Sequence, residues 1–446
     1  MEKTGKKSRK ILYLVLVVIA ILFGVAYYSI YSVLNVETIY EGIKVEEFDL
    51  SNKTKEDAIK LIESKREEEL EGKEMKLNYR DKVYSIGLKD LGFKYDYSKA
   101  VDEAYNIGRQ GTFINKLKII SNTKKEGKTF KLESSYDKKL IDKHVEEIKK
   151  DINLKSKNAV FNFNGGNFQV TEEVLGREVD EKTLKTAIED NIYILKDIEI
   201  PVNIIEPKVK KELLGRVNGV IGEFSTSLGN SSKDRKENIR ISSKSVSGKL
   251  LLPNETVSFN ELTGPRNVKN GYKEASIIVK GEFIPGLGGG VCQTSTTLYN
   301  ALLLANMTIV ERGHHSIPVK YVDLGHDATV SYGHIDLRFK NDFDFPVYIT
   351  MEVSNNKVYA RVYGDKNAKD YQVKITSEVV EKVKPKTEKI KDNSLKPGAK
   401  EVVQQGREGY KVNTYKQIIK NGKIVETKQI TSDYYKPSNY IYKVGP

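Results

Sequence analysis

The chain has 446 residues, with 74 basic and 61 acidic side chains and a formal net charge of +13. Hydrophobic residues make up 39%, and 26 tyrosines and 14 phenylalanines can build packed cores, so a wholly disordered chain is not expected. The single cysteine excludes an intramolecular disulfide, a disulfide scaffold and a cysteine-rich zinc module. At about 150 residues per domain, the length indicates about three domains.

The N-terminus predicts a membrane anchor. Ile11 to Val36 contains no charged residue, and about 20 apolar residues cross a bilayer as a helix. The preceding residues 1–10 are basic, which keeps this end in the cytoplasm by the positive-inside rule. No small-residue cleavage site clearly follows, so we expect an uncleaved transmembrane helix over 11–32, rather than a signal peptide, and an extracellular C-terminal body.

The body outside the membrane still carries more basic than acidic side chains. We expect no nucleic acid partner on that side, and an anionic cell-wall polymer would suit the charge. A solvated surface without a specific partner is the alternative, and composition does not choose between the two.

Residues 37–206 contain an internal repeat, in which Leu77–Asp96 aligns with Phe161–Asp180. Helical patterns precede and follow the two copies, over residues 54–70, 137–152, 98–108 and 181–192. Each copy therefore predicts a small α+β unit of helix, hairpin and helix. The region has no cysteine and one histidine, His144, so we expect binding or spacing here and no catalysis.

The last segment, 374–446, predicts a small all-β module. Its later part alternates apolar and polar residues, and Asn421-Gly422 between two such runs is a hairpin signal. It has no candidate nucleophile, so we expect an adaptor. The fold class expected for the whole chain is α+β multidomain, with the tandem repeats over 37–206 and a mixed α+β catalytic domain over 207–370.

One thiol in the central segment is placed at the start of a helix. Gly286 and Gly288 to Gly290 make an open backbone before Cys292, and Thr294–Met307 has helical composition. With Thr294 or Ser295 as the N-cap, Cys292 lies before or in the first turn, where the helix end favours a thiolate and free N–H groups bind an oxyanion. A small buried hydrophobe is the alternative, but a lone extracytoplasmic cysteine after a glycine-rich loop favours a nucleophile.

The histidines supply candidate bases. Four of the five lie between His314 and His334, and Arg312 is beside them. One imidazole would pair with the thiolate and be oriented by a carboxylate such as Asp327 or Asp336. The pattern does not choose among the four: His314, His315, His326 and His334. Three histidines with Cys292 would also suit a zinc hydrolase, but their spacing matches no helix-borne pair, and we expect no metal.

Four stretches in this order resemble the VanW domain family: 253–275, 288–301, 311–330 and 336–341. The repeated region resembles the peptidoglycan-binding domain that often precedes VanW domains, and the terminal module resembles a G5 domain, a type thought to bind N-acetylglucosamine-containing glycans. Some VanW-domain proteins are regarded as L,D-transpeptidases. The resemblance therefore implies peptidoglycan stem peptides and glycan strands as partners, and no cofactor.

The resemblance also implies a role for each matched residue. Cys292, in the GGGxCQ motif, would be the nucleophile; His315 and Ser316 fill the family's His-Ser position, and Arg312 its preceding arginine. The oxyanion would be stabilised by the loop residues Gly289, Gly290, Val291 and Gln293. His314 stands where the family often has proline, and His326 and His334 are extra, so His315 is favoured as the base. The implied activity is 3→3 crosslinking through a thioester, with L,D-carboxypeptidase activity as a variant; a non-catalytic wall-binding scaffold is the alternative.

Overall fold

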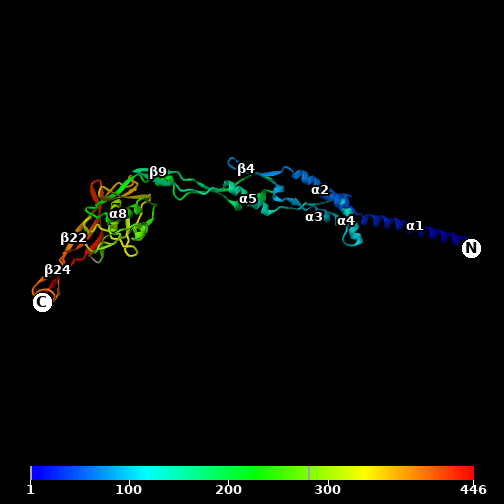
Figure 1. Ribbon diagram of the computed structural model, residues 1–446. Helices are drawn as coiled ribbons and strands as arrows, with labels where there is room; N and C mark the ends of the chain where they lie inside the picture. The colour runs from blue at the N-terminus through cyan, green and yellow to red at the C-terminus, as the bar shows by residue number, and fades with distance from the viewer. Residues whose placement is uncertain (1–2, 280–281) are drawn as a thin grey trace. The chain divides into compact units, whose positions relative to one another are not determined.

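The computed structural model describes residues 3–279 and 282–446, so Met1 and Glu2 of the expected basic tail lie outside the described residues. The chain divides into two compact units (Figure 1). The first comprises Met1–Ser156 and Leu175–Glu206, and the second comprises Lys157–Val174 and Pro207–Pro446. Both mix helices and strands, which confirms the α+β class.

The apolar N-terminal stretch forms helix α1 (Lys3–Leu34). Its segment Lys7–Leu34 has a mean hydropathy of 2.6, and none of it is buried against other parts of the chain. At 1.5 Å per residue this segment is about 40 Å long, enough to cross a bilayer. Length and composition therefore suit a membrane span, and a signal sequence shares these two properties.

The helices expected in the repeats are present. They are α2 (Lys55–Leu70), α3 (Tyr97–Tyr105), α5 (Lys138–Ile152) and α6 (Glu181–Asn191). Each helix has an N-cap residue whose side-chain oxygen accepts a hydrogen bond from a backbone N–H of the first turn. The N-caps are, in the same order, Thr54, Asp96, Asp137 and Asp180. Helix α4 (Phe113–Glu126) is an additional element that the repeat did not predict.

The repeat hairpins pack differently from the expectation of two self-contained units. In the first copy, β3 (Glu74–Tyr79) and β4 (Lys82–Gly87) share a core with α5 and α6, the helices of the second copy. Strand β11 (Ile198–Glu199) pairs in parallel with β3 and extends this sheet. Helices α2 and α3 instead share a core with β1 (Ile43–Val45). The first hairpin is therefore contributed to the next module along the chain.

The second hairpin also packs on the part of the chain that follows its own repeat copy. Strands β8 (Val160–Asn164) and β9 (Asn167–Thr171) belong to the second unit, although residues 157–174 were expected with the repeats. The ring of Phe161 lies 5.0 Å from that of Tyr348, and Phe163 lies 5.2 Å from both Tyr348 and Tyr363. Such tilted aromatic pairs add to the burial of apolar surface, and they hold the hairpin on the second unit.

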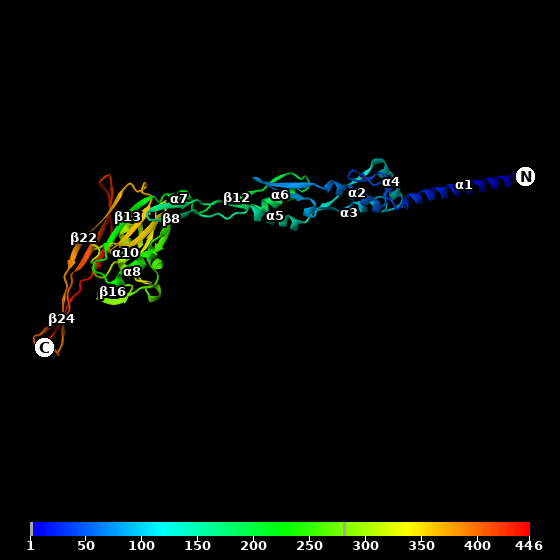
Figure 2. The ribbon, with the colours of Figure 1, turned by 45° about the horizontal axis from the view of Figure 1, so that its top comes forward.

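The main sheet of the second unit is antiparallel (Figure 2). Its order is β13 (Gly219–Ser227), β21 (Lys357–Gly364), β20 (Val347–Ser354) and β14 (Lys249–Leu251). Helices α8 (Lys233–Val246) and α10 (Val291–Ala305) pack on it and share its core. Gly222 allows the close approach, because a Cβ there would lie 2.5 Å from the carbonyl oxygen of Ala301.

Smaller elements complete this part of the second unit. Strands β15 (Thr256–Ser258), β19 (Arg338–Lys340) and β18 (Thr308–Glu311) form a second sheet. Helix α9 (Phe259–Thr263) follows β15 directly. Strands β16 (Glu274–Val279) and β17 (Glu282–Leu287) form a hairpin that leads into α10.

The C-terminal segment is all β. One sheet has the order β22 (Gln372–Val383), β25 (Gly409–Lys420), β26 (Lys423–Tyr435), and the other has β23 (Thr387–Lys391), β27 (Tyr440–Val444), β24 (Lys400–Gln404). Asn421 and Gly422 turn the predicted hairpin with φ angles of 53° and 73°, as a tight β-hairpin turn requires. Val412 and Tyr435 are buried, and Ile375 and Ile430 pack on the same core as α10. The module is thus continuous with the central domain.

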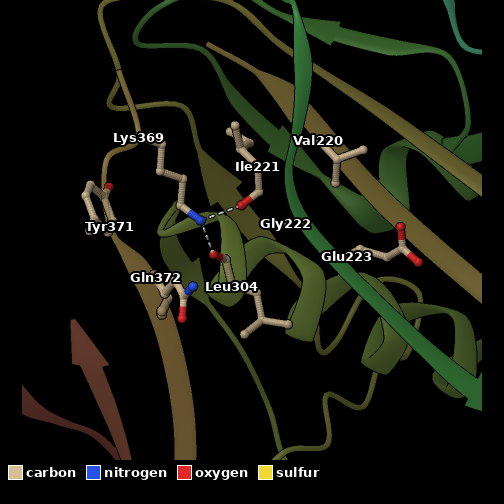
Figure 3. Close-up of a pocket in the computed structure, with 9 residues that line it drawn as sticks. Val220, Ile221, Gly222, Glu223, Leu304, Lys369, Tyr371 and Gln372 are labelled. Carbon is tan, nitrogen blue, oxygen red and sulfur yellow. Dashed lines mark hydrogen bonds between the residues drawn. The ribbon is translucent and has the colours of Figure 1, made fainter. Parts of the chain in front are cut away.

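A cavity of about 350 Å³ lies at the C-terminal end of α10 (Figure 3). The Lys369 ammonium group enters it and donates to the carbonyl oxygens of Leu304, at 2.9 Å, and Ile221. Leu304 belongs to the last turn of α10, so the ammonium group satisfies a helix end, although burial lowers the pKa of Lys369 to about 8. Cys292 lies at the opposite end of α10, so this cavity is remote from the thiol.

Candidate active site

Helix α10 places Cys292 in its first turn. The helix begins at Val291, earlier than expected, and Gly290 is its N-cap with no side-chain hydrogen bond. Thr294 and Ser295 are fully buried inside the helix, so the expectation that one of them is the N-cap is wrong. The first N–H groups of a helix have no intrahelical acceptor, so the thiol lies beside backbone donors at the positive end of the helix dipole.

The backbone before Cys292 requires glycine. Gly290 has a φ of 111°, and a Cβ there would lie 2.9 Å from Cγ1 of Ile239. A Cβ on Gly289 would lie 2.6 Å from the carbonyl oxygen of Ala275. Both glycines are buried, so the loop that was expected to be open is tightly packed on one side.

Polar side chains of α10 hold the loop that carries Asp327. Ser295 Oγ donates to the carbonyl oxygen of Ala328 at 2.7 Å, and Thr296 Oγ1 accepts the Ala328 N–H at 3.0 Å. Asn300 Nδ2 donates to the carbonyl oxygen of His326 at 2.8 Å. These buried bonds replace the backbone partners that an irregular loop lacks, and they fix the carboxylate beside the helix that bears the thiol.

Cys292, His315 and Asp327 form a series of interacting side chains. Asp327 Oδ2 accepts from His315 Nδ1 at 2.5 Å and from the His315 backbone N–H at 2.7 Å. The His315 side chain interacts electrostatically with the Cys292 thiol, and since Nδ1 is engaged by Asp327, Nε2 is the nitrogen left for the sulfur. The thiol itself forms hydrogen bonds of 3.5 Å with Thr329 Oγ1 and with the carbonyl oxygen of Val330. His315 is 5% exposed, whereas Cys292 is only half-buried. The arrangement has the order nucleophile, base and orienting carboxylate.

The charges of the three groups support one another. Burial by itself would raise the pKa of the Cys292 thiol, but the hydrogen bond and positive charge of His315 outweigh burial and lower the pKa to about 7. Burial likewise disfavours the imidazolium, yet Asp327 and Cys292 raise the pKa of His315 to about 9. Asp327 is also buried, but His315 and Arg312 lower its pKa to about 2. Near neutral pH the pair therefore favours thiolate and imidazolium.

The backbone donors differ from the expected set. The Val291 N–H donates to Gly288 at 3.1 Å and the Gln293 N–H donates to Gly290 at 2.9 Å, so both are already engaged. Among the described residues, the N–H groups of Gly290 and Cys292 have no acceptor. The Gly289 N–H likewise has no acceptor in the described part of the chain, so the N–H groups of Gly289, Gly290 and Cys292 remain free to bind an oxyanion. The Gln293 side chain is engaged as well, since its Nε2 donates to the carbonyl oxygen of Ser227 at 2.8 Å.

Arg312 braces the carboxylate and lies away from the thiol. Its side chain is 7% exposed and pairs with Asp433 at 2.6 Å and with Asp327 at 3.4 Å. Its Nε donates to the backbone carbonyl of Asp327 at 2.7 Å. Ser316, by contrast, is exposed and forms no hydrogen bond with the described part of the chain. Arg312 thus contacts Asp327 and Asp433, whereas Ser316 contacts neither by a hydrogen bond.

Two residues of the C-terminal module complete this network, and sequence reasoning missed both. Tyr435 donates from its hydroxyl to Asp327 Oδ1 at 2.5 Å and accepts the Gly325 N–H at 2.9 Å. Asp433 is 5% exposed and pairs with Arg312. No motif marked either residue, because both lie on a strand assigned to a separate adaptor.

The remaining candidates lie outside the series. His314 donates from Nδ1 to the His315 carbonyl oxygen at 2.8 Å, and its ring packs against Tyr435. His326 is partly buried, and its Nε2 has no partner among the described residues. His334 is exposed, and with Asp336 it lines a second cavity of about 360 Å³. Asp336 accepts the Asn260 N–H at 3.0 Å, which gives it a structural role.

The zinc alternative required several histidines around Cys292. Of the clustered histidines, His315 is the one that contacts the thiol. Within the described ranges, no three His, Cys, Asp or Glu side chains come together as a metal-binding group.

Comparison with known families places this site in a named domain. Residues 234–363 match the family of VanW like proteins, a range that contains Cys292, His315 and Asp327. The chain contains a VanW-like domain. Residues 84–197 match a peptidoglycan binding domain and residues 374–446 match the G5 domain, as the sequence resemblance implied. The three domains together associate the chain with the cell wall.

Part of the chain is similar to proteins of two bacteria. The chain is 46% identical over 153 residues to the uncharacterized protein YoaR of Bacillus subtilis (strain 168), covering 34% of this chain and 50% of that protein. It is 32% identical over 134 residues to the vancomycin B-type resistance protein VanW of Enterococcus faecalis (strain ATCC 700802 / V583), covering 29% and 49%. The chain thus spans about half the length of the curated relatives it matches.

Two solved structures of G5 domains are similar to part of the chain. The crystal structure of HP0197-G5 is 28% identical and covers 17% of this chain and 97% of its own, with a TM-score of 0.13. The IgA1 protease G5 domain structure is 22% identical and covers 17% and 92%, with a TM-score of 0.14.

Proposed function

We propose that this chain is a cysteine-dependent L,D-transpeptidase that forms 3→3 crosslinks in peptidoglycan. The observation that carries the proposal is the series Cys292, His315 and Asp327, with a half-buried thiol in the first turn of α10. The VanW-like, peptidoglycan binding and G5 domains support a cell-wall substrate. The lowered thiol pKa supports nucleophilic attack near neutral pH.

In the first half-reaction, the Cys292 thiolate attacks the carbonyl carbon of the third residue of a tetrapeptide stem. The negative charge moves to the carbonyl oxygen, which the N–H groups of Gly290 and Cys292 stabilise. The C–N bond then breaks, and the amine of the terminal D-alanine leaves with the proton from Nε2 of His315. Asp327 stabilises the imidazolium and holds its tautomer, and a thioester remains on Cys292.

In the second half-reaction, the side-chain amine of a diamino acid on a neighbouring stem attacks the thioester. Neutral His315 accepts the proton of the amine, the C–S bond breaks, and the Cys292 thiolate is restored. Water in place of the amine would give L,D-carboxypeptidase activity. The energy of the cleaved peptide bond is kept in the thioester, so the reaction needs no nucleotide.

The same proposal assigns the chain to the outer face of the cell membrane. Helix α1 is long and apolar enough to remain as an anchor, and the basic residues before it favour a cytoplasmic N-terminus. The peptidoglycan binding and G5 domains would then hold the site against the wall.

The full chain in detergent, incubated with tetrapeptide-containing muropeptides, tests the activity. Mass spectrometry should detect D-alanine release and crosslinked dimers with the wild type and neither with Cys292→Ala. Acylation by a carbapenem should add mass to the wild type and not to Cys292→Ala. If both proteins bind wall material but release no D-alanine, the chain is a membrane-tethered scaffold and the enzyme proposal fails.

A further inference from the structure

Two arginines flank the glycine loop that precedes the thiol. Arg235 lies in the first turn of α8, and a Cβ on Gly290 would lie 3.1 Å from its Nη1. Arg266 follows α9, and a Cβ on Gly288 would lie 2.7 Å from its Cγ. The Arg235 guanidinium and the aliphatic part of the Arg266 side chain therefore pack against the two ends of this loop.

Neither arginine is neutralised by a carboxylate. Arg235 donates to Gln293 Oε1 at 2.8 Å and to Ser231 Oγ at 3.2 Å. Arg266 donates to Asn260 Oδ1 at 2.7 Å and to the Gly264 carbonyl oxygen at 3.1 Å. All four acceptors are neutral, and no described carboxylate lies within ion-pair distance of either guanidinium. Each guanidinium group therefore still has N–H donors that can bind a ligand.

The lack of a carboxylate partner is unusual for half-buried arginines, because a charge removed from water is normally paired with an opposite charge. Arg66, Arg216 and Arg361, elsewhere in the chain, each pair with carboxylates. Burial lowers the pKa of Arg235 and of Arg266, and both guanidinium groups interact electrostatically with Cys292. Asp336, the acidic group that also acts on Arg266, is occupied by Ser258 and Asn260.

We propose that Arg235 and Arg266 bind the C-terminal carboxylate of the acyl-donor peptide and so select a peptide with one residue beyond the attacked carbonyl. The inference rests on the proposed function, and it names the recognition group of the substrate. In such a peptide only the amide nitrogen and one Cα separate the carboxylate from the attacked carbon. A carboxylate is the partner that a guanidinium fork binds best.

The geometry predicts selection by peptide length. A peptide with two residues beyond the attacked carbonyl would place a neutral peptide bond between the arginines, and its carboxylate would lie one residue farther away. A peptide ending in a carboxamide would place a neutral group there. Both changes leave two half-buried guanidinium groups without their anion, which costs affinity.

The test compares a tetrapeptide with its C-terminal carboxamide and with the pentapeptide, using the full chain in detergent. The wild type should favour the free tetrapeptide about 10- to 100-fold in kcat/KM. Arg235→Gln and Arg266→Gln should each reduce that preference, mainly through KM for the free tetrapeptide. Arg240→Gln is the matched control, because Arg240 is exposed on the same helix and pairs with Glu237, and its preference should equal that of the wild type.

Two further measurements keep the inference separate from the proposed chemistry. Calorimetric binding to Cys292→Ala should show the same preference for the free tetrapeptide without turnover, so the inference stands on binding even if no D-alanine is released. Equal binding of tetrapeptide and carboxamide overturns it. The inference also fails if Arg235→Gln and Arg266→Gln lower kcat/KM equally for the tetrapeptide and its carboxamide and if iodoacetamide alkylation shows a higher pKa of the Cys292 thiol. The arginines would then only stabilise the thiolate.

Discussion

The Tyr435 hydroxyl donates a 2.5 Å hydrogen bond to Oδ1 of Asp327, whose other carboxylate oxygen accepts from His315. Tyr435 is the last residue of β26, in the range that matches the G5 domain. The segment expected to be an adaptor therefore supplies a side chain to the network behind the thiol. The VanW-like domain and the C-terminal module share one site and one core.

Replacing Tyr435 by phenylalanine tests this contact. Tyr435→Phe keeps the buried ring but removes a hydrogen bond to a charged group, so we expect the unfolding free energy to fall by about 1.5–3 kcal/mol. The Asp327 pKa should rise, because the Tyr435 hydrogen bond is one cause of its lowering. Chemical denaturation measures the first effect. Tyr434→Phe is the control, since Tyr434 is 40% exposed, and equal stability of the two variants would contradict the assignment.

Removing the ion pair between Arg312 and Asp433 tests whether this charge interaction helps to hold the C-terminal module on the central domain. Asp433→Asn leaves Arg312 buried with Asp327 as its remaining anion, and breaking a buried pair costs about 3–5 kcal/mol. Asp370→Asn removes an exposed partner of Lys420, where about 0–1 kcal/mol is expected. Thermal unfolding of both variants against the wild type measures the contrast. Two small and equal shifts would show that the Asp433 pair does not hold the module in place.

The pH dependence of two reaction rates, acylation by a peptide and alkylation by iodoacetamide, should separate attack by the thiolate from proton transfer. Acylation by a peptide needs deprotonated Cys292 and protonated His315, so its rate should rise through about pH 7 and fall through about pH 9. Alkylation by iodoacetamide needs only the thiolate, and its rate should rise through about pH 7 and then stay level.

In Asp327→Asn the His315 pKa should fall and the Cys292 pKa should rise, because the anion that stabilises the imidazolium is lost. The alkylation profile should therefore move to higher pH. An unchanged profile in this variant would show that Asp327 does not act on the pair.

The backbone at Gly290 should tolerate no side chain. Gly290→Ala combines a φ of 111° with a 2.9 Å approach to Ile239, and strained backbone alone costs about 1–3 kcal/mol. Gly166→Ala, with a φ of 99° and nothing within 4 Å of the added Cβ, isolates the backbone cost. Circular dichroism and thermal unfolding should show a larger loss for Gly290→Ala. Equal losses would mean that the loop accommodates the methyl group.

Much of the local structure followed from short-range patterns. Thr54 and Asp137 cap the helices that the apolar spacing predicted, and Asn421-Gly422 turns the predicted hairpin. These features depend on interactions between residues close in the chain, so the sequence displays them. The start of α10 was misjudged because glycine, without a side-chain cap, begins this helix, and the hydroxyls of Thr294 and Ser295 bond to Ser242 and Ala328 instead.

The choice among the candidate site residues depended on contacts between distant segments. The sequence offered four clustered histidines and two aspartates, and the spacing could not rank them. Hydrogen bonds from α10 to residues 326–328 bring Asp327, and not Asp336, to His315. No motif singled out Tyr435 or Arg235, and Arg266 lies in a matched stretch without being marked in it, because their contacts form only where separate elements meet.

The apolar N-terminal helix, the repeated α+β region and the single cysteine after a glycine loop could all be predicted from the amino-acid sequence. The family resemblance already favoured His315, but contacts between distant segments set which module receives each repeat hairpin, place Asp327 beside His315, and bring the C-terminal strands to Asp327. The difference lies in how far apart along the chain the interacting residues are. Helix caps, turns and apolar periodicity are set within a few residues, whereas burial and the partners of a charged side chain are set by whichever distant segments pack around it.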